Sequence, residues 1–253
     1  MDEVVARLRR AGCVFAEDEA ELLRAEAGAD ADRLARLIDQ RVRGNPLEHV
    51  LGWVRFCGLR IHLVAGVFVP RRRTELLARQ ACERLGDGAV AVDVCCGSGA
   101  VAAAVQHAVP GAQVWACDVD DRAVACARRN LGAERVRGGD LFDGLPGQLR
   151  GRVRVITANA PYVPSAAVGT MPPEAREYEP RTALDGGGDG LGVQRRVIAE
   201  AVGWLTPGGS VLIETGADQA ARTAELLDGA GLLARIESCA ELDATVAVGT
   251  RTT

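Results

Sequence analysis

The sequence predicts an α/β protein whose larger domain holds a parallel β-sheet covered by helices on both faces. Two observations carry this prediction. From residue 89 onward, short apolar runs alternate with amphipathic segments, which is the order of a strand, helix, strand chain. The first of these runs ends in a glycine-containing turn that opens a helix, as at the start of a nucleotide-binding βαβ unit. Strands of this kind present a ligand site where they end.

Residues 1–45 are expected to form a small helical domain. Between residues 2 and 43, apolar side chains recur at helical spacing in three short segments. Gly44-Asn45-Pro46 ends the last segment. Residues 46–70 are expected to be a linker with a hairpin over residues 53–63, where near-alternating apolar residues flank Gly58. Thr74 then predicts the N-cap of a helix that carries Leu76 and Leu77.

Residues 71–253 are expected to form the sheet domain. Seven strands are predicted, over residues 89–94, 113–117, 135–136, 153–158, 210–214, 232–237 and 244–248. Helices are predicted over residues 100–108 and 122–131. Between residues 162 and 192 several prolines and Gly186-Gly187-Gly188 interrupt any periodicity, so no regular element is expected there. Loops of this length are commonly lids or binding loops.

Composition narrows the class of protein. Hydrophobic residues make up 48% of the 253-residue chain, which is ordinary for a globular protein, and no apolar run reaches membrane-spanning length. Met1-Asp2-Glu3 opens the chain without a basic head and an apolar stretch, so a cytoplasmic location is expected. The eight cysteines contain no C-x-x-C pair and fit reduced core thiols better than zinc ligands. A net charge of −4 gives no general attraction to nucleic acid.

Three acidic residues, Asp93, Asp118 and Asp140, follow three successive strands. Open α/β sheets bind ligands at this edge. Asp93 lies beside the glycine turn. Its negative charge would repel the pyrophosphate of a dinucleotide there, but it suits a cofactor with a cationic amine and a sulfonium. S-adenosylmethionine has both groups. The three carboxylates are therefore expected to receive its amine, its ribose hydroxyls and its adenine amino group, although any one of them alone could be a turn residue or a helix cap.

The neighbours of these acids complete the predicted cofactor site. Glycines in the turn after the first strand would let the ligand lie against bare backbone at a helix N-terminus. The turn residues and the residues next to the acids are assigned to this site: Cys95, Cys96, Gly97, Gly99, Val119 and Leu141. No metal ion is expected.

The predicted strand over residues 153–158 ends in Asn159-Ala160-Pro161-Tyr162. Pro161 lacks a backbone donor and holds residue 160 extended, which turns carbonyl oxygens outward. A primary amide or aromatic amine offers two N–H donors, which the Asn159 side-chain oxygen and the Ala160 carbonyl could accept. That pairing would aim the nitrogen lone pair at a methyl carbon. Tyr162 would form an apolar wall beside the planar acceptor, unless it is simply a core aromatic.

With these residues in view, the sequence resembles the protein-(glutamine N(5)) methyltransferases of the HemK/PrmC type, which modify peptide chain release factors. The likeness covers roughly residues 45–248. It rests on short stretches spread along that part of the chain: residues 45–52, 67–71, 74–75, 93–99, 118, 139–142, 159–162, 179–191 and 213–216.

The resemblance implies a class I methyltransferase domain with a Rossmann-like, seven-stranded sheet behind a helical substrate-docking domain. It implies methylation of a glutamine side chain in a Gly-Gly-Gln loop of a release factor. By the same resemblance Asn159 to Tyr162 are catalytic, Asn159 also touches the cofactor, and Arg71 and Glu75 join Asn159 and Tyr162 in binding the substrate. No direct contact with nucleic acid or membrane is expected.

The sequence departs from the family pattern inside its motifs. Ala160 stands where the family has the first proline of Asn-Pro-Pro-Tyr, Cys95 replaces a glycine, and Arg72-Arg73 replaces Pro-Glu. Two alternatives therefore stay open. One is N-methylation of a small-molecule amine or of adenine in nucleic acid, since the same pair of acceptors would orient those nitrogens. The other is a paralogue that binds S-adenosylmethionine but has impaired catalysis.

Overall fold

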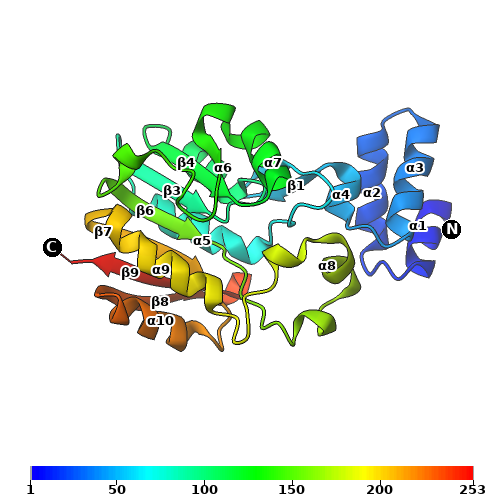
Figure 1. Ribbon diagram of the computed structural model, residues 1–253. Helices are drawn as coiled ribbons and strands as arrows, with labels where there is room; N and C mark the ends of the chain where they lie inside the picture. Colours follow the sequence, from blue (N-terminus) through cyan, green and yellow to red (C-terminus); the bar gives the residue numbers. More distant parts are fainter. Residues whose placement is uncertain (1, 253) are drawn as a thin grey trace.

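The chain folds into a small helical cluster and a larger sheet domain, seen at opposite sides of Figure 1. The structure is a computed structural model and describes residues 2–252. Within these residues no helix is both long and apolar enough to cross a membrane. Nor does any group of three His, Cys, Asp or Glu side chains there have an arrangement that could hold a metal ion.

The helical cluster contains the three predicted helices and a fourth, shorter one. Their bounds are α1 (Glu3–Arg10), α2 (Ala16–Ala27), α3 (Ala31–Val42) and α4 (Leu47–Leu51). Leu8, Leu23 and Ile38 come from α1, α2 and α3 and are buried together, with Val50 of α4 packed against them. The cluster therefore extends past the Gly44-Asn45-Pro46 turn that was expected to end it.

The predicted hairpin follows directly. Strands β1 (Trp53–Phe56) and β2 (Leu59–His62) pair antiparallel through a two-residue turn. Both turn residues, Cys57 and Gly58, have positive φ angles, as this tight hairpin turn requires. After the linker comes α5 (Glu75–Cys82).

Seven strands form the sheet in the order β5-β4-β3-β6-β7-β9-β8. Their bounds are β3 (Val90–Val94), β4 (Gln113–Asp118), β5 (Val136–Gly138), β6 (Val153–Ala158), β7 (Leu205–Glu214), β8 (Leu232–Cys239) and β9 (Ala244–Arg251). Strands β4 and β5 are added on one side of β3, whereas β6, which is parallel to β3, is added on its other side. The carboxyl ends of β3 and β6 therefore lie next to each other where the strand order switches, which is the ligand edge of such sheets.

Alternate side chains along the central strands enter two separate cores. Ala91, Val155 and Leu212 lie in the core beneath one set of helices, whereas their neighbours Val92 and Ile156 lie in the other core. The first set is α5, α6 (Ala100–Ala108) and α7 (Asp121–Leu131), and the second is α9 (Gly192–Trp204) and α10 (Ala220–Gly229). Helices on both faces confirm the predicted layers.

The sheet is mixed, which corrects the prediction of a wholly parallel sheet. Strand β9 runs antiparallel to both β7 and β8. Only a short turn, ending at Asp243 with a φ of 48°, joins β8 to β9. A connection this short allows an antiparallel pair, because a parallel pair needs a long crossover.

The expectation of no regular element between residues 162 and 192 is wrong. A short helix, α8 (Pro173–Tyr178), forms there. It begins at a proline, which helices tolerate in the first turn because that N–H has no helical partner anyway. In Figure 1, α8 lies between the helical cluster and the sheet. Arg41 of α3 reaches it and donates to Glu174 over 2.6 Å, so the segment bridges the two parts of the molecule.

Candidate active site

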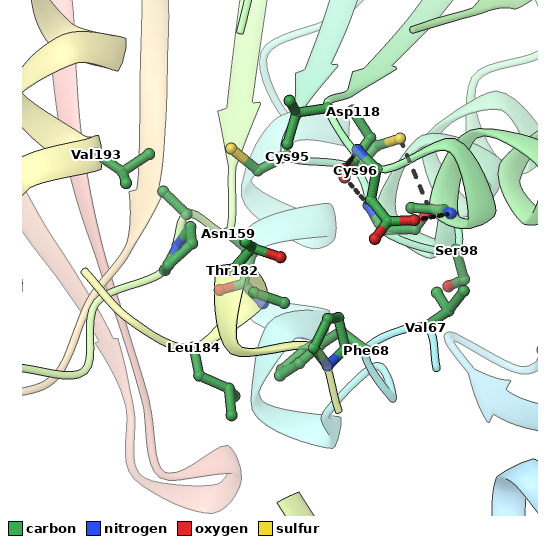
Figure 2. A pocket seen from close by; sticks show the side chains of 18 of the residues that line it. Val67, Phe68, Cys95, Cys96, Ser98, Asp118, Asn159, Thr182, Leu184 and Val193 are labelled. Atoms are coloured by element: carbon green, nitrogen blue, oxygen red, sulfur yellow. Dashed lines mark hydrogen bonds between the residues drawn. The ribbon is translucent and has the colours of Figure 1, made fainter. Parts of the chain in front are cut away.

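One large cavity opens at the carboxyl ends of β3, β4 and β6. Its walls come from the linker before α5, the turns after these three strands, the segment after residue 162, and α9. Figure 2 shows Cys95, Asp118 and Asn159 reaching this space from different strands, with Phe68 and Leu184 on the opposite side. Nine of the ten residues predicted for the cofactor site line the cavity: Asp93, Cys95, Cys96, Gly97, Asp118, Val119, Asp140, Leu141 and Asn159.

Asp93 is a buried carboxylate with one oxygen left free. Its side chain is only 3% exposed, and Oδ1 accepts a 2.7 Å hydrogen bond from the hydroxyl of Thr157, its register partner on β6. Oδ2 has no partner among the described residues. Burial raises the pKa of Asp93 to about 7, and the Thr157 hydrogen bond only partly opposes that rise. A cation placed at Oδ2 would satisfy this oxygen and favour the charged form.

Asp118 is held by backbone donors on both carboxylate oxygens. The Gly97 amide donates to Oδ2 over 2.8 Å, and the Asp120 amide donates to Oδ1 over 2.9 Å. Burial raises the pKa of Asp118, and these two amides work against that effect. Each oxygen keeps a second lone pair, so the carboxylate can still accept hydrogen bonds from two neighbouring hydroxyls.

The turn after β3 exposes backbone to the cavity. Gly97 has a φ of 55°, and a Cβ added there would meet no atom within 4 Å. Gly99, with a φ of 75°, serves a different purpose, because an added Cβ would lie 3.0 Å from the Cβ of Ala127 on α7. Gly99 thus allows α6 and α7 to pack closely and does not line the cavity. Cys95 also has a positive φ, 55°, which is uncommon for a residue with a side chain.

Asp140 lines the cavity and forms an ion pair with Arg196, a residue that the sequence analysis did not identify. Arg196 of α9 donates to its Oδ2 over 2.7 Å, and the Asp140 side chain is half exposed. Next to it, Leu141 adopts a φ of 52°. Val119 is 66% exposed on the same side, an apolar surface open to the cavity.

These features fit S-adenosylmethionine. The unpartnered oxygen of Asp93 suits a cationic amine, and the bare backbone at Gly97 leaves room for the chain that carries it. The remaining lone pairs of Asp118 suit vicinal ribose hydroxyls. Val119 and Leu141 offer apolar surface to a purine, with Asp140 beside them.

The end of β6 brings Asn159-Ala160-Pro161-Tyr162 to the same cavity. The Asn159 side-chain nitrogen donates to the Thr74 hydroxyl over 3.3 Å, which leaves its Oδ1 for other donors. Among residues 2–252 no donor is bonded to that oxygen or to the Ala160 carbonyl oxygen. Tyr162 is half-buried, and burial raises its pKa. Two acceptor oxygens without a donor therefore belong to neighbouring residues at the end of this strand.

The segment before α9 closes one side of the cavity. Glu179 accepts two hydrogen bonds from Arg71, at 2.7 and 2.8 Å, and one from the Val69 amide at 3.1 Å. Asp185 accepts from the Ser165 hydroxyl over 2.6 Å. Arg71 lines the cavity, but its guanidinium tip is engaged with Glu179. The segment expected to be a lid or a binding loop is thus tied to the linker.

Glu75, which the resemblance assigns to the substrate site, lies outside the cavity. Its carboxylate accepts from the Cys57 amide in the hairpin turn over 3.1 Å and pairs with Arg79 one helical turn later. Glu75 is absent from the cavity wall. Its position at the start of α5 places it on the side that faces the hairpin.

Sequence reasoning also missed three residues that contact predicted site residues: Thr74, Thr157 and Arg196. Thr74 occupies the N-cap position of α5, as predicted, but its side chain makes no capping bond and instead contacts Asn159. Thr157 could have been found from register, because it stands opposite Asp93 on the neighbouring strand. No sequence pattern pointed to Arg196, because α9 is brought next to Asp140 only by the packing of the folded chain.

Comparison with known proteins agrees with this geometry. A family model described as "Methyltransferase small domain" matches residues 59–172. The solved structure of a methyltransferase from Pyrococcus furiosus superposes with a TM-score of 0.58 at 17% identity, covering 94% of this chain and 98% of that one. The fold is therefore that of the class I methyltransferases.

Two curated relatives share more of the sequence. The release factor glutamine methyltransferase of Mycobacterium leprae is 37% identical over 235 residues, which cover 85% of this chain and 82% of the relative. That of Geobacter sulfurreducens is 38% identical over 188 residues, covering 73% of this chain and 65% of the relative. Identity at this level over most of both chains shows the family. This chain belongs to the release factor glutamine methyltransferases.

Proposed function

We propose that the protein transfers a methyl group from S-adenosylmethionine to the side-chain amide nitrogen of a glutamine in a peptide chain release factor. The observation that carries this proposal is the pair of free acceptors at the end of β6, Asn159 Oδ1 and the Ala160 carbonyl, in a cavity that the buried acid Asp93 also lines. One edge of the sheet thus offers a place for a cation and a place for a planar amide.

The two acceptors would act by holding the glutamine amide. Each accepts one of its two N–H donors, which fixes the plane of the amide and its nitrogen. Amide nitrogen is a weak nucleophile, so orientation must supply much of the rate, and well-oriented reactants can recover roughly 7–11 kcal/mol. Tyr162 lines the same cavity and would cover the amide plane on one side.

When bound, S-adenosylmethionine would supply a methyl group carried on its sulfonium. The C–N bond to the amide would form as the C–S bond breaks, and the electron pair of the C–S bond would stay on sulfur. The amide nitrogen then gives up one proton to water. Asn159 and Ala160 draw the amide hydrogens toward oxygen throughout, which disperses the positive charge that develops on nitrogen. No side chain has to accept the proton.

We also assign residues 1–45, which contain helices α1 to α3 of the helical cluster, to docking of the protein substrate, with residues 46–70 as linker and residues 71–253 as the catalytic domain. Val14 and Phe15, between α1 and α2, are 81% and 67% exposed. Tyr178 of α8 donates to the Arg43 carbonyl over 2.9 Å, so the cluster is held against the segment that borders the cavity. A protein bound to the cluster would lie next to the acceptor site.

The proposal is tested by comparing acceptors. The protein is incubated with S-adenosylmethionine and, separately, a class 1 release factor, an adenine-containing oligonucleotide or small amines, and S-adenosylhomocysteine formation is followed. Turnover with the release factor is expected, and turnover confined to the other acceptors would overturn the proposal. Asn159→Ala should lose turnover while calorimetry still detects cofactor binding, which separates loss of orientation from loss of the cofactor site.

A further inference from the structure

Three arginines line the cavity, and Arg73 is the one that lacks a close acidic partner among the described residues. Arg71 and Arg196 each donate to a carboxylate over 2.7 Å. The Nε of Arg73 lies 3.4 Å from Oε1 of Glu214, a long contact, and the Arg73 side chain is 45% exposed. Within residues 2–252, neither Nη atom of Arg73 donates a hydrogen bond. The outer end of this guanidinium is therefore open to a ligand.

Strand register places this guanidinium beside the acceptor site. Strands β6 and β7 run parallel, and Ala158 lies opposite Ile213. The next residues on the two strands are Asn159 and Glu214, so the carboxylate that Arg73 contacts ends the strand next to Asn159. Neighbouring strands lie about 4.8 Å apart. Since Arg73 and Asn159 also line the same cavity, the Nη donors of Arg73 border the place proposed for the glutamine amide.

The predicted cofactor site lies on the other side of Asn159. The strand order is β4, β3, β6, β7, and Asp118 and Asp93 belong to β4 and β3. Asn159 follows β6, and Arg73 is anchored at the end of β7. Across the sheet, Asn159 therefore stands between Asp93 and Arg73. A group that binds Arg73 extends from the side of the methyl acceptor.

A guanidinium with free Nη donors binds oxygen acceptors, and its parallel N–H groups match a carboxylate. We propose that Arg73 is a specificity-determining residue that binds an oxygen acceptor of the protein substrate beside the target glutamine. The acceptor is either an acidic side chain or a main-chain carbonyl. This second attachment fixes the chain that carries the glutamine while Asn159 and Ala160 hold its amide. The inference rests on the proposed function.

Steady-state kinetics with the full-length protein and a class 1 release factor test this role. Arg73→Gln should raise KM for the release factor about tenfold, as expected for loss of a hydrogen bond from a charged group. Its kcat and its calorimetric affinity for S-adenosylmethionine should stay near wild type. Arg72→Gln is the matched control, because it removes the same charge from an exposed neighbour that does not line the cavity. Its KM should equal that of the wild type.

Two more variants separate substrate binding from pairing with Glu214, which is 2% exposed. Glu214→Gln removes the buried acid and keeps Arg73, so KM should stay near wild type. Arg73→Gln combined with Glu214→Gln leaves no buried carboxylate without its arginine and should show the same raised KM as Arg73→Gln. If Arg73 served only to pair with Glu214, Glu214→Gln would raise KM as much as Arg73→Gln does.

Salt dependence identifies the acceptor. Added salt screens an ion pair at a half-exposed site. The ratio of KM between Arg73→Gln and the wild type should therefore fall with added salt if the acceptor is an acidic side chain. The ratio should stay constant if the acceptor is a main-chain carbonyl.

The outcomes keep the two claims apart. If the wild-type protein methylates no release factor, the proposed function fails and this inference fails with it. If the release factor is methylated and Arg73→Gln keeps the wild-type KM, or Arg72→Gln raises KM equally, the specificity role alone is wrong. A loss of cofactor affinity in Arg73→Gln would also overturn it, because the guanidinium would then bind the carboxylate of S-adenosylmethionine.

Discussion

Lowering the pH from 7 to 5 should weaken the binding of S-adenosylmethionine by about 50-fold, through protonation of Asp93. The pKa of this carboxyl is raised to about 7 by burial, and we propose that the cationic amine of the cofactor binds its ionised form. Half of the carboxyl is then ionised at pH 7 and about 1% at pH 5, a ratio that corresponds to roughly 2.3 kcal/mol of binding free energy. The amine itself stays protonated across this range.

Unfolding does not explain such a loss, because Asp93 acts on stability in the opposite sense. Its folded-state pKa of about 7 lies above the ordinary aspartate value of 3.8, so the folded protein retains the proton over this interval. The contribution of Asp93 to the free energy of unfolding therefore increases as the pH falls from about 7 toward 4, and it is lost as the pH rises through about 7. Weaker binding at pH 5 would come from the site alone.

Calorimetric titration with S-adenosylmethionine between pH 5 and 7, at constant ionic strength, measures this effect. Asp93→Asn is the control: it should bind weakly at all pH values, and any slope that remains belongs to Asp118 and other groups. A wild-type affinity that stays constant from pH 7 to 5, or an Asp93→Asn variant with the full wild-type slope, would refute the assignment of the amine to Asp93.

Three further predictions concern other parts of the molecule. Cys95→Val should weaken cofactor binding more than Cys95→Gly in calorimetry, because a β-branched residue is strained at a φ of 55° and glycine is not. Arg41→Met leaves the buried carboxylate of Glu19, bonded at 2.6 Å, without its partner, and should lower the urea unfolding free energy by roughly 3–5 kcal/mol. Phe15→Ser should raise KM for the release factor in steady-state assays and leave cofactor affinity unchanged; an unaltered KM would contradict docking at this helix turn.

Local patterns were enough to predict the ligand edge of the sheet. Asp93, Asp118 and Asn159 each end a strand, and parallel strands bring their ends to one edge, so their meeting in one cavity follows from chain order. The glycine turn could be predicted from the sequence too, because Gly97 has no side chain and leaves the backbone accessible to a ligand. Each of these residues lies close in sequence to an apolar run, and that run by itself predicts a strand.

Long-range contacts could not be predicted in this way. Thr74 was expected to cap a helix, which is the common role of threonine before a helical segment, but its hydroxyl meets Asn159, which is 85 residues away. Glu75 could face the cavity or the hairpin, and only the packing of α5 against the hairpin decides. The pairing of Asp140 with Arg196 depends on how α9 lies over the sheet. No local pattern carries such information.

The central claim is that Asn159 and Ala160 orient a glutamine amide for methylation. The most direct measurement uses S-adenosylmethionine with an isotope-labelled methyl group, a class 1 release factor and peptide mass spectrometry of the product. The account predicts one labelled methyl on the side-chain amide nitrogen of a single glutamine, within the Gly-Gly-Gln loop. Label on lysine, arginine or the peptide backbone, or an unlabelled release factor alongside a labelled nucleic acid or amine, would contradict it.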